Sequence, residues 1–93
     1  MPTQITQIDD DARSVTIYRI DGEMFADDVE LIRRIAMQQK FETGNSIVID
    51  IADLDLLDSD AASLLRELER DHGFEIAGAE IFLQNLVNAA EKA

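Results

Sequence analysis

Residues 46–65 read SIVIDIADLDLLDSDAASLL, and this stretch decides the fold. Its first part, residues 46–52, holds Ile47, Val48 and Ile49 in a row, followed by Ile51. β-Branched residues favour strands, and a short apolar run with little alternation is typical of a strand that is buried on both faces. We therefore predict a central strand here, in a sheet with helices on both sides.

The second part of the stretch predicts a helix that begins at Asp58 or Ser59. Both residue types are favoured at helix starts, because their side chains accept hydrogen bonds from the first free backbone N–H groups. The helix ends at His72-Gly73, with Gly73 as the left-handed residue that closes it. Its buried face recurs at helical spacing, at Ala61, Leu64, Leu65 and Leu68.

The elements outside this stretch alternate between strands and helices. Residues 2–8 and 14–20 are expected as strands joined by the acidic turn at 9–13, and Asp21-Gly22 closes the second. A helix follows up to Gly44, with Asp27 and Glu30 resembling a capping box. A strand at 74–77 leads into a last helix. The apolar residues that define the two helices are Phe25, Val29, Ile32 and Ala36 in the first and Leu83, Leu86, Val87 and Ala90 in the last.

The resulting order is β-β-α-β-α-β-α, which indicates an α/β fold. We predict a small, mostly parallel or mixed four-stranded sheet with three helices. The 93 residues, numbered 1–93, are expected to form a single domain.

Composition restricts the function classes. The net charge is −12, from 20 acidic and 8 basic residues, and such a surface repels nucleic acid and anionic lipid heads. The acid excess favours basic protein partners, or serves solubility alone. The chain has no cysteine, which excludes disulfides, thiolate metal sites and thiol catalysis. No apolar stretch approaches the roughly 20 residues that span a bilayer, and no signal peptide is evident. We expect a cytoplasmic protein without direct membrane insertion.

Five carboxylates raise the question of a metal or an acid–base site: Asp50, Asp53, Asp55, Asp58 and Asp60. A calcium loop needs acids at alternate positions, then Gly and Glu, whereas Leu56-Leu57 follows Asp55 here. A strand end, a turn and a helix start each favour Asp for their own reasons. His72, the only histidine, has no recognisable nucleophile beside it. We therefore predict no metal, no cofactor and no enzymatic activity.

Ser59 has two interpretations. A phosphate at a helix N-terminus meets free N–H groups and adds close to two negative charges, so Ser59 is a natural switch position. The alternative is a structural N-cap that stabilises the helix by about 1 kcal/mol.

Residues 47–65 resemble the signature of STAS domains, the family of bacterial anti-sigma factor antagonists. In that family a strand of the type Val-Leu-Asp-Leu leads to Asp-Ser-Ser-Gly or Asp-Thr-Ala-Gly and then to a leucine-bearing helix. Residues 20–24 (IDGEM) look like the entry to the family's first helix, and residues 73–78 (GFEIAG) look like its next strand. The resemblance covers roughly residues 14–88.

The resemblance implies a regulatory domain that binds an anti-sigma factor kinase-like protein until phosphorylation at the start of the second helix abolishes binding. Asp58 and Ser59 match the family's Asp and first hydroxyl residue. Asp60 stands at the usual phosphoserine position, where it cannot accept a phosphate from a Ser/Thr kinase and imitates a phosphorylated state instead. Ala61 replaces the family Gly, and many relatives continue with another strand and helix.

A second STAS role is the alternative. Small members accompany ABC-type lipid transporters and contact the transporter ATPase, and their key hydroxyl follows the Asp directly, as Ser59 does. In either role we expect the partner to bind at the start of the second helix. The residues predicted to do so are Asp58, Ser59, Asp60, Ala61 and Ser63. The sequence leaves the oligomeric state open, although a net charge of −12 weighs against tight self-association.

Overall fold

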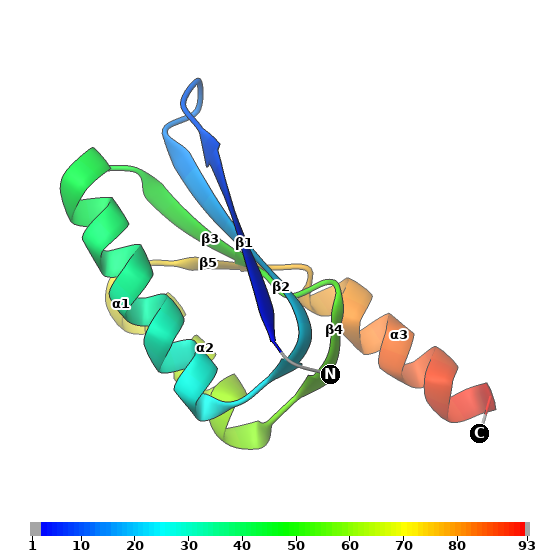
Figure 1. Ribbon diagram of the computed structural model, residues 1–93. Helices are drawn as coiled ribbons and strands as arrows, with labels where there is room; N and C mark the ends of the chain where they lie inside the picture. Colours follow the sequence, from blue (N-terminus) through cyan, green and yellow to red (C-terminus); the bar gives the residue numbers. More distant parts are fainter. Residues whose placement is uncertain (1–2, 93) are drawn as a thin grey trace.

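The computed structural model describes residues 3–92 and places five strands and three helices in them (Figure 1). The elements are β1 (Gln4–Asp10), β2 (Val15–Met24), α1 (Ala26–Thr43), β3 (Ser46–Asp50), β4 (Leu54–Leu57), α2 (Ser59–His72), β5 (Glu75–Ala77) and α3 (Ala79–Lys92). The α/β class, the mixed sheet and the three helices agree with the prediction. The Pro2 end of the first predicted strand lies outside the described residues.

The sheet runs β1-β2-β3-β5, with β1 antiparallel to β2 and the remaining pairs parallel. β2 is the longest strand and the scaffold of the molecule. It pairs with β1 over seven positions, with β3 over its first half and with β4 at its far end. The predicted turn between the first two strands lies beyond Asp10, where the backbone N–H of Ser14 donates to the Asp11 carbonyl at 3.4 Å.

β4 is the element that the sequence analysis missed, so the observed order is β-β-α-β-β-α-β-α. β2 does not end at Asp21-Gly22 as predicted. It continues to Met24, and the register shifts between Gly22 and Glu23 where β4 joins it. This irregular pairing extends the sheet to the end of β4. Because α2 follows β4 directly, the pairing also places the start of α2 beside the end of β2.

One face of the sheet is buried much more deeply than the other. Along β2, the buried residues alternate with half-buried or exposed ones, and the buried set is Thr16, Tyr18, Ile20, Gly22 and Met24. β3 repeats this alternation, with Ile47 and Ile49 buried and Val48 half-buried. The prediction that β3 is buried on both faces was therefore wrong. α1 and α2 cover the same face and pack on each other, so the apolar side chains of that face form the core.

The helix ends are set by local chemistry. Gly44 and Gly73 close α1 and α2 in the left-handed conformation, with φ of 75° and 68°. The N–H of Gly73 donates to the Leu68 carbonyl, which confirms the predicted end of the second helix. At the start of α1 the predicted Asp27–Glu30 box was wrong. The Asp28 carboxylate instead accepts a hydrogen bond from the Phe25 N–H at 2.9 Å and another from the Thr3 hydroxyl at 3.0 Å.

Gly78 joins β5 to α3 at a point with no room for a side chain. Its φ is +83°, and a Cβ built there would lie 2.6 Å from the Ala52 backbone nitrogen. That nitrogen donates to the Asp50 carboxylate at 3.0 Å, so the end of β3 folds back tightly against Gly78. The absence of a side chain at position 78 therefore allows the turn from β3 into β4 to pack directly against it.

α3 leaves the body of the molecule as an arm (Figure 1). Among its described side chains, Phe82 alone is buried. The predicted apolar face of this helix exists, but it is not covered. Leu83, Leu86 and Val87 are exposed at 58, 43 and 50% of their surface.

Candidate functional site

The start of α2 is held in place by the end of β2. The N–H of Asp58 donates to the Met24 carbonyl at 3.0 Å, which extends the pairing of β4 with β2 by one bond. The Asp58 carboxylate then accepts a hydrogen bond from the Asp60 N–H at 3.1 Å. Asp58 is therefore the N-cap, and Ser59 is the first residue inside the helix. The structure assigns the capping role that the sequence left between these two residues.

Three of the five predicted site residues lie together on the surface. Ser59, Asp60 and Ser63 are exposed, Asp58 is half-buried, and Ala61 has an exposed fraction of 0%. Ala61 packs into the core with Leu65 and Leu68. A residue larger than alanine at position 61 would have to displace that core, so Ala61 shapes the surface from below. We name Asp58, Ser59, Asp60 and Ser63 the α2-start surface.

Two arginines extend this surface and were missed by the sequence analysis. Helical spacing places Ser63, Arg66 and Arg70 on one side of α2, where they line a shallow depression. Arg66 makes no ion pair with any residue in the range 3–92. Arg70 is paired with Asp71, at 3.0 Å between Nε and Oδ1. The intervals of three and four residues after Ser63 were the signal that could have identified both arginines.

Near this surface, Arg70 and Asp71 have pKa values that differ from the ordinary values of their side chains. The hydrogen bond from Arg70 holds the pKa of the Asp71 carboxyl below its ordinary value. The same bond raises the pKa of the Arg70 guanidinium. Both groups are exposed, so solvent screens the pair and it contributes little to stability. Both charges are present at neutral pH, and the surface therefore carries alternating signs.

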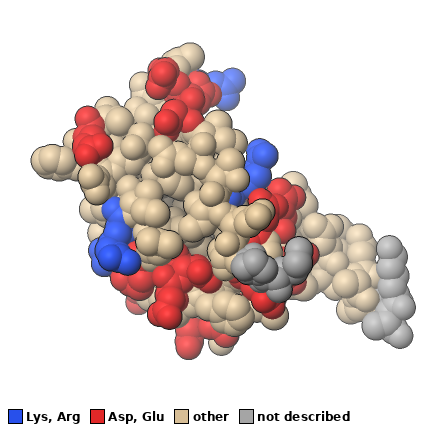
Figure 2. Space-filling view, in the orientation of Figure 1, with Lys and Arg blue, Asp and Glu red and all other residues tan. Residues whose placement is uncertain are grey.

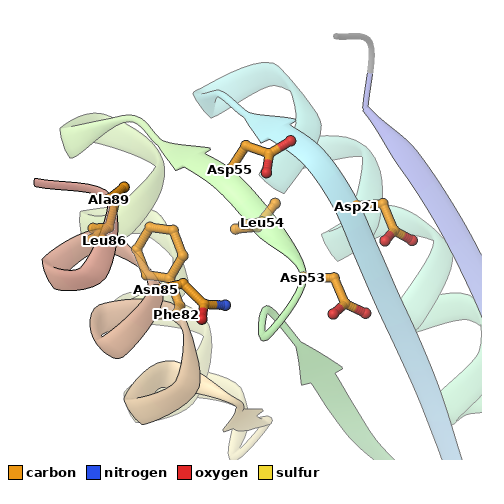
Figure 3. A pocket seen from close by; sticks show the side chains of 8 residues that line it. All are labelled: Asp21, Asp53, Leu54, Asp55, Phe82, Asn85, Leu86 and Ala89. Atoms are coloured by element: carbon orange, nitrogen blue, oxygen red, sulfur yellow. The ribbon is translucent and has the colours of Figure 1, made fainter. Parts of the chain in front are cut away.

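The remaining acids do not converge with the α2-start surface. Asp21, Asp53 and Asp55 line a shallow cavity of about 440 Å³ between β4 and α3, together with Phe82, Asn85 and Leu86 (Figure 3). Asp50 lies at the end of β3, where it caps the Ala52 N–H and faces Arg19 at 3.8 Å. Among the residues in the range 3–92, no group of three or more His, Cys, Asp and Glu is arranged to hold a metal ion.

The fold and the surface together define an α/β module whose exposed helix start is built on a strand end. The sequence profile of the STAS domain family matches residues 4–87. The chain therefore belongs to the STAS domain family. Members of this family are typically non-catalytic regulatory modules that act on protein partners. No curated protein sequence matches the chain.

Solved structures share this fold at low sequence identity. An anti-sigma factor antagonist STAS domain from Rhodobacter sphaeroides is 23% identical, with a TM-score of 0.60 over 85% of this chain and 89% of that one. A protein with a SpoIIAA-like fold from Shewanella loihica is 21% identical, with a TM-score of 0.59 over 76% and 57%. The unphosphorylated anti-sigma factor antagonist SpoIIAA is 22% identical, with a TM-score of 0.54 over 75% and 62%. These likenesses show the anti-sigma factor antagonist-like fold.

Within residues 3–92, no helix has both the length and the apolar character needed to cross a membrane.

Proposed function

We propose that this chain is a regulatory protein-binding module of the cytoplasm that resembles anti-sigma factor antagonists and contacts its partner through the α2-start surface. The observation that carries the proposal is the exposure of Ser59, Asp60 and Ser63 on a helix start fixed by two hydrogen bonds of Asp58. A rigid and exposed surface requires little ordering when a partner binds, which favours affinity. Membership of the STAS family supports a protein rather than a small molecule as the ligand.

Asp60 distinguishes this surface from one that a kinase switches. We propose that its carboxylate holds permanently the negative charge that a phosphate would add at this position. A carboxylate carries one charge and two acceptor atoms, whereas a phosphate carries close to two charges and three acceptors. Asp60 therefore imitates the phosphorylated form incompletely. The surface then has a constant charge, and partner binding is controlled by something other than a phosphate at residue 60.

The test is affinity capture with matched variants of the whole chain as baits. Asp60→Lys reverses a charge on the α2-start surface. Asp11→Lys makes the same change on an exposed acid at the hairpin tip. The tip lies about 30 Å from Met24, because β2 spans nine steps of roughly 3.3 Å. We expect a partner that the natural chain and Asp11→Lys retain and that Asp60→Lys and Ser59→Ala lose.

The identity of the retained partner separates the two STAS roles. A histidine-kinase-like ATPase supports the anti-sigma factor antagonist role, whereas the ATPase of a lipid transporter supports the accessory role. Thermal denaturation of each bait is the control, since every variant must be fully folded at the temperature of the capture experiment. Equal retention of every captured protein by all variants would refute the α2-start surface as the contact.

A further inference from the structure

We propose that the α3 arm is a dimerisation element, which packs on a second copy of this chain through its Leu83, Leu86 and Val87 side. The first observation is the exposure of these three side chains, at 58, 43 and 50%. Together with Ala79 and Ala90 they follow intervals of four and three residues, which places them on one side of the helix. A contiguous exposed apolar stripe of this kind marks an interaction site.

The second observation is a groove that continues this stripe across the body. It lies beside α2 and β5, and Ile51, Leu57, Leu65, Ile76 and Ala79 form its apolar lining, with Arg66 and Glu69 among its polar residues. Ala79 is the first residue of α3 and belongs to both the groove and the stripe. The two surfaces therefore meet at the base of the arm and form one bent apolar surface. The arm projects away from the body, so this surface is open to a partner of the same shape (Figure 1).

Charge argues for a second copy rather than a charged partner. Residues 81–90 contain no Asp, Glu, Lys or Arg, and they are the longest uncharged stretch in a chain whose net charge is −12. Two copies repel each other through the acidic surface of the body, where Figure 2 shows the acidic side chains in red. Residues 81–90 of the arm add no charge of their own to a contact between two copies.

The buried area favours a dimer in which the α3 arm of each copy lies in the groove of the other copy. A helix of 14 residues is about 21 Å long and about 10 Å wide, so one side of it presents on the order of 300 Å². Two arms that touch only each other bury about 600 Å², which is below the 1,200–2,000 Å² of a stable interface. If each arm covers the groove of the other copy and buries an equal area there, the two contacts together bury about 1,200 Å², which is the lower limit of that range. A two-fold axis relates the two equal contacts.

Sedimentation velocity on the full chain tests the proposal with a matched pair of variants. Leu83→Glu places a charge on the stripe. Ile81→Glu places one on the opposite side of α3, at a residue that is exposed to the same extent, 57% against 58%. We expect the natural chain and Ile81→Glu to dimerise. Each substitution is present twice in a symmetric dimer. If Leu83→Glu weakens each contact tenfold, the dissociation constant of the dimer rises about a hundredfold. Added salt should tighten the dimer by screening the repulsion between the bodies.

Cross-linking distinguishes a second copy from the arm's own body. The chain has no cysteine, so Val87→Cys on the arm and Glu69→Cys on the groove introduce unique thiols. A disulfide between these two single variants when they are mixed supports exchange. Three results would overturn the proposal. The first is a natural chain that stays monomeric at all concentrations up to about 1 mM. The second is a dimer that Leu83→Glu leaves intact. The third is a chain carrying both Val87→Cys and Glu69→Cys that forms a disulfide within itself.

Discussion

A substitution at Gly78 tests the turn between β3 and β4, which leads toward the start of α2. A methyl group at position 78 would collide with the backbone of that turn at Ala52. In Gly78→Ala the new Cβ would lie 2.6 Å from the Ala52 nitrogen and 2.7 Å from an Asp50 carboxylate oxygen. The backbone nitrogen cannot move aside without shifting the turn between β3 and β4. A second cost comes from φ of +83°, which an L-residue with a side chain adopts at a penalty of roughly 1–2 kcal/mol.

Gly73 is the matched control, since its φ is +68° and a Cβ there would meet no atom within 4 Å. Gly73→Ala therefore incurs the conformational penalty alone, about 1–2 kcal/mol. Gly78→Ala adds the cost of overpacking, typically about 1–3 kcal/mol, for a total of about 2–5 kcal/mol. The comparison thus isolates the steric term at Gly78.

Urea denaturation of the two variants and the natural chain measures both costs. With a slope of about 1–1.5 kcal/mol per molar for a domain of this size, Gly78→Ala should unfold at least about 0.7 M earlier than Gly73→Ala. Equal midpoints for the two variants would mean that Ala52 and Asp50 yield without cost, contrary to this prediction.

Two further predictions concern the cap and the core. Asp58→Ala should lower the free energy of unfolding by about 1 kcal/mol in urea denaturation, whereas Asp58→Asn, which still accepts the Asp60 N–H, should not; equal losses would contradict the capping role. Tyr18 is 1% exposed, and its hydroxyl has no partner among the described residues, so Tyr18→Phe should be within about 1 kcal/mol of neutral at pH 7. Burial, together with the charge of Asp9, raises the Tyr18 pKa above 10.0; the stability due to this group is therefore present below pH 10 and is lost as the pH rises through the folded-state pKa. Denaturation in alkaline buffer should show that loss in the natural chain and not in Tyr18→Phe, and an identical pH profile would contradict it.

Local patterns in the sequence predicted the elements whose boundaries depend on neighbouring residues. The helical spacing of Ala61, Leu65 and Leu68 identified the buried face of α2, and Gly73 identified its end. These features follow from backbone preference and periodicity, which the sequence carries directly. The same holds for the exposed helix start, because Asp58 is a preferred capping residue and no apolar side chain competes with it there.

The features that the sequence did not predict depend on contacts between distant segments. β4 is only four residues long, and it is a strand because Leu54 and Leu57 pair with Gly22 and Met24, more than 30 positions earlier. Nothing local distinguishes it from the turn that was predicted. The helical spacing predicted the apolar side of α3. It does not indicate whether the rest of the domain or solvent lies against that side. The burial of Ala61 likewise follows from the packing of α2 on the core.

We propose that the α2-start surface binds the partner, and the affinity of the purified partner for matched variants measures that contact. Isothermal titration calorimetry would compare the natural chain with Asp60→Lys and with Asp11→Lys, which make the same charge change about 30 Å apart on the scaffold of β2. We expect Asp60→Lys to weaken binding at least about tenfold and Asp11→Lys to leave Kd within about twofold of the natural chain. An equal loss in both variants, or no loss in Asp60→Lys, would contradict it.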